Sequence, residues 1–282
     1  MSTWMFPSLA EALAGLLPRE EKSVIVSSNS WDVRYSVTTL AISGFRPFTI
    51  ENTGGWVSGG SPAIVSGFGG ALIRDIGVDQ KAFWVVTDKL SVQDIENEAF
   101  KLGARVMSIA SYQLYGEPRK WAAILVGNTA GLKWYLWADT TPADITSKLK
   151  ANNARLIDLR PTQPINGNEY NYTAVAIDNS GLNHHNFVWY HNRTTQQVVD
   201  LVKQTGFRLV HLATEFGTAQ TGDTSCVILQ ENPSRLNWWW FADSDFNDID
   251  QFANASHMRV ICVARIHSVL NHYSAVLLQN GA

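Results

Sequence analysis

The stretch that decides the fold reads Trp134-Tyr-Leu-Trp-Ala-Asp-Thr-Thr-Pro-Ala-Asp-Ile145, and it continues downstream as Asn153-Ala-Arg-Leu-Ile-Asp-Leu159. The same order of aromatic run, helix-forming run and arginine-bearing run returns in segments that begin at Phe83, Phe187 and Trp238, and in a diverged form near Ser23. Self-similarity at a fixed period is the signature of a repeat architecture, so the chain is predicted to consist of tandem units.

One arginine marks each copy of the pattern, and consecutive marks lie 50 to 59 residues apart. These arginines are Arg46, Arg105, Arg155, Arg208 and Arg259. The matched spacings predict five units. A residue that repeats with the fold usually belongs to the fold, so we expect the arginines to be structural, buried against a carboxylate or a main-chain carbonyl. A ring of guanidinium groups that binds anions is the functional alternative.

Each unit of about 50 residues reads as strand, helix, strand, strand, which makes the chain an α+β repeat protein of βαββ units. Helix starts are indicated by four capping residues, each followed three positions later by an acidic or amide side chain: Ser91, Thr141, Thr194 and Asp245. Helix ends are indicated by residues that accept the left-handed conformation, namely Gly44, Gly103, Asn153 and Gly206, with His257 in the last copy.

A unit with one helix cannot cover both faces of its own sheet, so neighbouring units must pack on it. The last strand is as apolar as the internal ones, which favours a closed, five-bladed, propeller-like ring over an open solenoid, with the aromatic opening strands converging on the axis. The predicted units span residues 22–80, 81–132, 133–185, 186–236 and 237–282. Residues 1–21, with leucines at helical spacing between Leu9 and Leu17, are predicted to form an N-terminal helical extension.

Five short motifs carry a family resemblance: Gly44-Phe-Arg-Pro47, Gly103-Ala-Arg-Val106, Asn153-Ala-Arg-Leu156, Gly206-Phe-Arg-Leu209 and Tyr172-Thr-Ala-Val175. They resemble the repeats of the bacterial tandem repeat domain family, which also occur in the N-terminal half of fungal polyglycine hydrolases. The resemblance covers residues 22–280 and implies the repeat architecture. It carries over no catalytic residue, because the β-lactamase-like domain of those hydrolases has no counterpart in this chain. Ser147 and Lys150 have the S-x-x-K spacing but lack the accompanying S-D-N and K-T-G motifs.

The composition excludes several classes of protein. A net charge of −3, from 22 basic and 25 acidic residues, lacks the footprint of a nucleic-acid binder. No apolar run is long enough to span a bilayer and no signal peptide is visible, so a cytoplasmic protein without membrane contact is expected. Cys226 and Cys262 are too few for a disulfide scaffold and are expected to be buried free thiols. No metal, nucleotide or other cofactor motif is present, so neither a metal nor a cofactor is expected.

Tryptophan is the unusual component of the chain, with 11 residues, seven of them in the predicted opening strands. Side chains of this size either pack between units or line a pocket. If the opening strands converge on the axis, the five wedge-shaped units do not fill the space at the axis and leave a cavity there. We therefore expect Trp84, Trp134 and Trp238 to form walls of a ligand pocket.

The least regular segment of the chain is the glycine-rich stretch 52–63 in the first unit. Glycine lets the backbone approach a ligand closely, so Trp56, Ser58 and Ser61 are predicted to contact a ligand. His211, which alternates with apolar residues along a strand, and Asp243 are the predicted further polar contributors.

These features favour a non-catalytic, lectin-like protein that binds a sugar, a peptide or another small molecule in an aromatic pocket or on an aromatic surface. The alternative is a cofactor-independent enzyme, a cyclase or a hydrolase, that acts on a hydrophobic small molecule in an enclosed tryptophan-rich cavity. The sequence shows no catalytic triad, metal site or phosphate loop, and this favours binding over catalysis.

Overall fold

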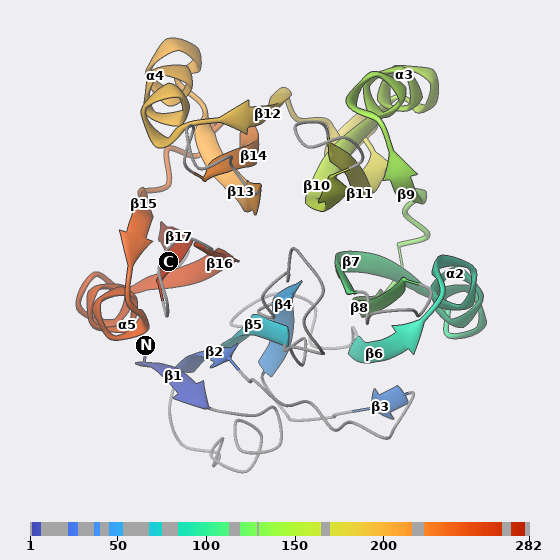
Figure 1. The fold of residues 1–282 in the computed structure, drawn as a ribbon, viewed down its shortest axis with the longest axis horizontal. Helices are drawn as coiled ribbons and strands as arrows, with labels where there is room; N and C mark the ends of the chain where they lie inside the picture. Colours follow the sequence, from blue (N-terminus) through green and yellow to red (C-terminus); the bar gives the residue numbers. More distant parts are fainter. Residues whose placement is uncertain are drawn as a thin grey trace.

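The computed structural model describes eleven segments of the chain: residues 2–6, 22–27, 37–39, 45–52, 68–74, 84–112, 119–128, 130–164, 170–215, 223–266 and 272–279. The chain is mostly β-sheet with a few helices, in several small sheets arranged around a common centre (Figure 1). The α-helices of the described residues are α2 (Val92–Lys101), α3 (Pro142–Asn152), α4 (Thr195–Thr205) and α5 (Phe246–Ala255), and η1 (Gly181–Asn183) is a short 3₁₀ helix.

Five sheets contain the described strands, and we number them in chain order. Sheet 1 runs β1 (Ser2–Phe6), β2 (Lys22–Ser27), β5 (Phe68–Arg74), β4 (Phe45–Asn52); sheet 2 runs β3 (Val37–Thr39), β6 (Trp84–Leu90), β8 (Lys120–Gly127), β7 (Ala104–Tyr112). Sheet 3 runs β9 (Trp134–Thr140), β11 (Tyr170–Asp178), β10 (Ala154–Pro164); sheet 4 runs β12 (Phe187–Arg193), β14 (Thr224–Gln230), β13 (Arg208–Glu215). Sheet 5 runs β15 (Trp238–Ser244), β17 (Tyr273–Gln279), β16 (Met258–Arg265).

The predicted helix boundaries are confirmed wherever the structure describes them. Ser91 and Thr194 each accept a hydrogen bond from the main chain three residues on, and that residue's side chain bonds back to the cap, which is a complete capping box. Thr141 accepts from the Asp144 N–H in the same way. The chain leaves the helices through left-handed residues, with φ of 46° at Asn153 and 52° at His257.

The strand order places the arginine-bearing strands at the inner edges of their sheets. In every sheet the strand that enters last in sequence lies in the middle, between the aromatic opening strand and the arginine strand. The inner strands β4, β7, β10, β13 and β16 contact one another in that order, and β16 also contacts β4 (Figure 1). The expectation that the aromatic opening strands converge on the axis is therefore wrong: β9, β12 and β15 lie at the outer edges.

All five inner strands share one irregularity, a β-bulge two residues after the arginine. The pairing register shifts there between Pro47 and Thr49, Val106 and Ser108, Leu156 and Asp158, Leu209 and His211, and Val260 and Cys262. A bulge bends its strand and re-aims the side chains that follow it. The residue three positions after each arginine, a polar residue or a cysteine in every case, is thereby set at the same point of its sheet.

Sheets 2, 3 and 4 each share a core cluster with the next sheet, as expected for repeat units. One core cluster joins Ile145 and Leu149 of α3 to Tyr172 of sheet 3 and also takes in Cys226 and Ile228 of sheet 4. The equivalent cluster under α4 likewise includes residues of sheet 5. Cys226 and Cys262 are both buried and unbonded to each other, which confirms the expectation of free thiols.

The N-terminal segment begins as a strand, because Ser2–Phe6 pairs in parallel with β2. The expectation of a helical extension over residues 1–21 is wrong for this part. The leucines between Leu9 and Leu17, on which that expectation depended, lie outside the described residues.

Replacing the cap residue Thr194 by alanine tests the helix assignment. We expect Thr194→Ala to lower the free energy of unfolding by about 1 kcal/mol, because the main-chain N–H of Gln197 loses its acceptor. The neighbouring exposed substitution Thr195→Ala is the control and should leave a denaturant melt unchanged. Equal melts for the two variants would contradict the capping role.

Candidate functional site

The inner strands surround a cavity of about 310 Å³. The described residues that line it are of three kinds. The first are three arginines and an amide, Arg105, Arg155, Arg208 and Gln230, and the second are apolar, Met107, Leu156, Ile157, Ile177, Val210, Ile261 and Leu278. The third are the buried polar residues Ser108, Asp158 and His211. Three neighbouring inner strands, β7, β10 and β13, supply most of them, so the cavity lies where the sheets meet.

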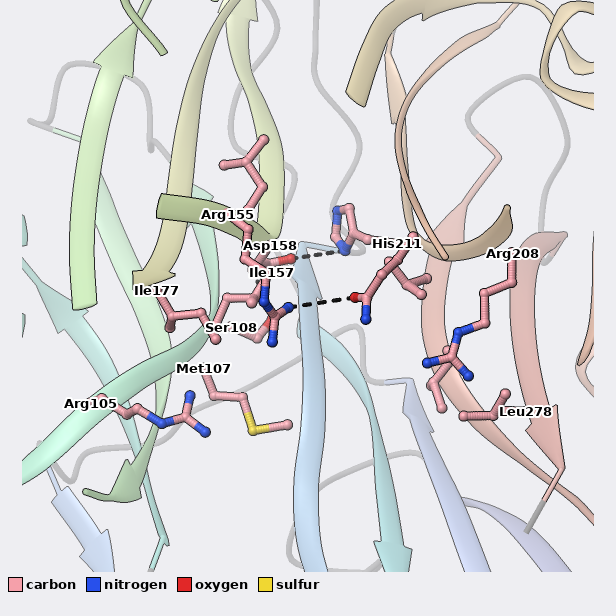
Figure 2. Close-up of a pocket in the computed structure, with 14 residues that line it drawn as sticks. Arg105, Met107, Ser108, Arg155, Ile157, Asp158, Ile177, Arg208, His211 and Leu278 are labelled. Carbon is pink, nitrogen blue, oxygen red and sulfur yellow. Dashed lines mark hydrogen bonds and ion pairs between the residues drawn. The ribbon is translucent and has the colours of Figure 1, made fainter. Parts of the chain in front are cut away.

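Three arginines enter this cavity from three successive sheets. Figure 2 shows the guanidinium groups of Arg105, Arg155 and Arg208 reaching into the same space. All three side chains are half-buried. Arg155 Nε donates to the Asn183 carbonyl at 3.4 Å, and its Nη1 donates to Gln230 Oε1 at 3.5 Å, both long for hydrogen bonds.

The pKa directions show that these arginines act on one another. Burial lowers the pKa of Arg155, and the charge of Arg105 lowers it further. Burial also lowers the pKa of His185, and Arg155 and Arg208 both add to that decrease, more than offsetting nearby Glu231. A guanidinium keeps its charge even so, which makes this cavity a region of concentrated positive potential.

Asp158 lies at one side of the cavity and is fully engaged by neighbours. Its Oδ2 accepts hydrogen bonds from Ser108 Oγ at 3.0 Å and from the Ile109 N–H at 2.7 Å, both on sheet 2. Its Oδ1 accepts from Arg160 Nε at 3.2 Å and lies 3.1 Å from His211 Nδ1 on sheet 4. The carboxylate is 2% exposed and joins three sheets.

His211 has a partner for each ring nitrogen in either protonation state. Nδ1 donates to Asp158. In the neutral ring, Nε2 accepts from the Leu159 N–H, whose nitrogen lies 3.3 Å away. In the protonated ring, Nε2 donates to the Leu159 carbonyl oxygen, which lies 2.8 Å away. Burial lowers the pKa of His211 to about 4, against the opposing charge of Asp158. The ring is therefore neutral at neutral pH.

The same contact recurs between consecutive sheets. Between consecutive sheets, a side chain of the later sheet contacts the main chain of the earlier one, and we call this contact the clasp. The side chain lies three positions after the arginine of its own strand. The main chain that it contacts lies four positions after the arginine of the earlier strand. Asp158 binds the Ile109 N–H, His211 binds Leu159, and Cys262 Sγ accepts from the Leu212 N–H at 3.4 Å and donates to its carbonyl at 3.1 Å. Because one position is used three times with three residue types, the clasp is a property of the fold.

The clasp engages three side chains that resemble a catalytic set. Asp158, His211 and Cys262 are the residue types of an acid, a base and a nucleophile, and Cys262 Sγ lies 3.7 Å from His211 Nδ1. A base must offer a lone pair to the substrate, but His211 Nε2 is held by Leu159. The Cys262 thiol already donates to Leu212. These side chains therefore hold neighbouring sheets together.

The predicted site residues are not brought together. His211 lines the cavity, but Asp243 is exposed on β15 and lies 2.5 Å from His272 Nδ1. Trp134 packs against the core under α2 and Trp238 against the core under α4. Neither tryptophan lines the cavity, and Trp84 is described only by its backbone in β6. Trp56, Ser58 and Ser61 lie outside the described residues.

The repetition of the arginines at one position is the sequence signal for this cavity, and the sequence leaves both a structural and an anion-binding role open for them. A cavity at the axis is expected from the sequence. Its lining by inner strands is not, because the bulge that positions the neighbouring side chains is not visible in a pattern of apolar and polar residues. Gln230, at the end of β14, carried no sequence signal.

A second hollow of about 600 Å³ lies between α3 and the opening strand β12, at the outer side of the sheets. Its lining is the most aromatic of the two: Phe187, Trp189, Tyr190 and His191, with Val188, Arg193, Pro142, Ala143, Thr146 and Leu149. The Trp189 and His191 rings lie 5.9 Å apart, and the Arg193 guanidinium lies 5.6 Å from the Tyr190 ring. The aromatic side chains of sheet 4 therefore gather away from the central cavity.

The pKa of His211 predicts how stability depends on pH. Its pKa in the folded protein lies below the value of about 6.5 expected when unfolded, so its contribution is fully present above that value and is lost as the pH falls toward 4. Relative to His211→Gln, the wild type should lose roughly 3 kcal/mol of unfolding free energy between pH 6.5 and 4. Urea melts of both proteins across this range measure the difference.

The comparison with the variant is needed because burial raises the pKa of Glu215, which has the opposite effect in the acid range. Glu215 is present in both proteins and cancels in the difference. A difference in unfolding free energy that stays constant from pH 6.5 to 4 would show that His211 does not titrate as its surroundings indicate.

Removing the charge of Asp158 tests the clasp. We expect Asp158→Ala to destabilise the protein by about 3–5 kcal/mol, because the buried Arg160 loses the carboxylate it is paired with and the Ile109 N–H loses its acceptor. Asp200→Ala is the control, since Asp200 is an exposed carboxylate on α4 that accepts from Gln196 and should matter little. Comparable thermal melts for the two variants would contradict the structural role of Asp158.

Comparison with known proteins gives no family for this chain: no protein-family model matches it, and no curated protein is similar to it. Within the described segments, no helix is long and apolar enough to cross a membrane. The same segments contain no group of three histidine, cysteine, aspartate or glutamate side chains placed to hold a metal ion. The two hollows and the residues that line them are therefore the features that indicate a function.

Proposed function

We propose that this chain is a ligand-binding repeat protein in which five βαββ units close into a ring and hold a small organic anion in the central cavity. Membership of the bacterial tandem repeat domain family stays a prediction from the repeated motifs. The proposal keeps the expectation of a binding protein but moves the site from the tryptophans to the arginines.

The shared bulge and strand order support the ring. The five inner strands carry the same register shift after their arginine, and their contacts run from β4 through β7, β10 and β13 to β16 and back to β4. Thr49 occupies the clasp position of the first unit in sequence, and Val263 is the residue it would meet on the last. A clasp between them would close the ring by the interaction that joins the other units.

The convergence of Arg105, Arg155 and Arg208 on one cavity is the observation that carries the binding proposal. Guanidinium groups bind carboxylate, sulfate and phosphate through paired, charge-assisted hydrogen bonds. The described lining contains one acidic residue, Asp158, and its oxygens are engaged by Ser108, the Ile109 N–H, Arg160 and His211. This carboxylate is thus occupied by other groups, and in our proposal the arginines contact the bound anion.

The walls indicate what the rest of the ligand is. Met107, Ile157, Val210 and Ile261 are the bulge residues of their strands, and they line the cavity beside the arginines. Apolar walls around a few polar groups are typical of small-molecule sites. A compact apolar body with one acidic group fits this lining, so we assign the ligand to small organic carboxylates. The absence of an available base or nucleophile among the described lining favours binding over catalysis.

Substituting Arg155 separates a binding role from a structural one. With benzoate and inorganic sulfate as probes, Arg155→Met should weaken binding at least about tenfold in calorimetric titrations, because a charge-assisted hydrogen bond is worth about 1.5–3 kcal/mol. The unliganded variant should melt no lower than the wild type, since repulsion from Arg105 is relieved. Arg119→Met, an arginine outside the cavity paired with Asp139, is the control and should bind the probes normally.

The opposite result would restore the structural interpretation. If Arg155→Met loses about 2–4 kcal/mol of stability while benzoate and sulfate bind neither protein, the arginines serve the fold alone.

A further inference from the structure

The opening strands differ in what covers their outer edge. In sheet 1 the strand β1 pairs with β2, and in sheet 2 the strand β3 pairs with β6. The equivalent strands β9, β12 and β15 have a neighbour on one side only within the described segments. This chain thus adds an extra strand to two of five equivalent edges.

The position of β1 shows how such a strand is held. It runs parallel to β2, with Ser2 opposite Lys22 and Phe6 opposite Val26, and it also contacts α5 of sheet 5. It therefore lies between the opening strand of one unit and the helix of the unit before it in the ring (Figure 1). The hollow between β12 and α3 occupies the same position in sheet 4, where α3 belongs to the preceding unit.

The free edge of β12 offers main-chain groups to this hollow. The Glu231 N–H donates to the Asn186 carbonyl at 3.0 Å, so Asn186 directs its main chain toward β14. Hydrogen-bonding direction alternates along an antiparallel strand, which turns the main chain of Phe187 and Trp189 outward. An outward row of N–H and C=O groups is a template for strand addition.

Arg193 supplies a charge at the far end of the hollow. Its Nε is shielded from solvent and has no hydrogen-bond partner among the described residues. The preceding residue, Asn192, has φ of 52° and donates its N–H to Glu215 Oε2 at 2.6 Å. Glu215 is itself fixed by Tyr172 Oη at 2.5 Å and Thr224 Oγ1 at 3.1 Å. The end of β12 is thus fixed by Glu215, and the Arg193 Nε beside it has no acceptor among the described residues.

We propose that the hollow between β12 and α3 is a docking site for an extended peptide of another protein, which adds in parallel to β12 as β1 adds to β2. In that orientation the peptide ends at Arg193, so its last residues are acidic or carry the C-terminal carboxylate. Its apolar residues contact Trp189 on one side and Pro142 and Thr146 of α3 on the other. This site is separate from the central cavity and does not depend on the anion.

A fluorescently labelled peptide with the sequence Ser-Thr-Trp-Met-Phe-Asp-Glu tests the proposal, because its first five residues copy β1. Fluorescence anisotropy should show saturable binding, and hydrogen exchange of the bound protein should slow at amides of residues 187–191. Arg193→Gln should weaken binding about tenfold, the loss of one charge-assisted hydrogen bond. Arg119→Gln should bind like the wild type. A peptide ending in Lys-Lys tests the charge without altering the protein.

Three outcomes would overturn the proposal. The first is no binding of the acidic peptide at millimolar concentration to a folded wild type. The second is binding that neither protects β12 nor distinguishes the acidic from the basic peptide. The third is a dimer in sedimentation experiments that dissociates when residues 1–8 are deleted, which would assign the hollow to the N-terminal strand of a second copy.

Discussion

The clasp between neighbouring sheets is the interaction on which the rest of the structure depends. A bulge two residues after the arginine aims the next side chain at the main chain of the preceding sheet. Asp158, His211 and Cys262 then satisfy buried N–H or C=O groups that belong to another unit. An unsatisfied buried main-chain group is costly, so each of these contacts fixes two sheets at once.

The bulge also accounts for the chemistry of the cavity. The residue at the bulge, such as Ile157 or Val210, faces the cavity as an apolar wall, and the arginine before it reaches the same space. Repetition therefore brings like charges together without any unit being special. Burying like charges opposes stability, so the contacts between neighbouring sheets must offset this repulsion. The anion that we propose for this cavity would reduce the same repulsion.

Local features of this fold could be predicted from the sequence, and the order of strands could not. Ser91, Thr141 and Thr194 mark helix starts because capping depends on residues three positions apart. Strand order depends on pairings between segments distant in sequence. The expectation that Trp134 and Trp238 approach the axis assumed that the opening strands lie innermost. The last strand of each sheet lies in its middle instead, and in sheets 3, 4 and 5 the opening strand becomes the outer edge.

The outer edges of the sheets are where the repeated pattern leaves main-chain groups without a partner strand. An opening strand at the edge of its sheet has outward N–H and C=O groups that need a partner or water. Within the described residues, β1 and β3 cover two such edges, and neither strand is part of the repeated pattern. The departures from symmetry therefore lie in the strands added to those edges. The two binding sites that we propose follow this division: the anion site lies at inner edges, where the arginines recur, and the peptide site lies at an outer edge, where the described sheets differ from one another.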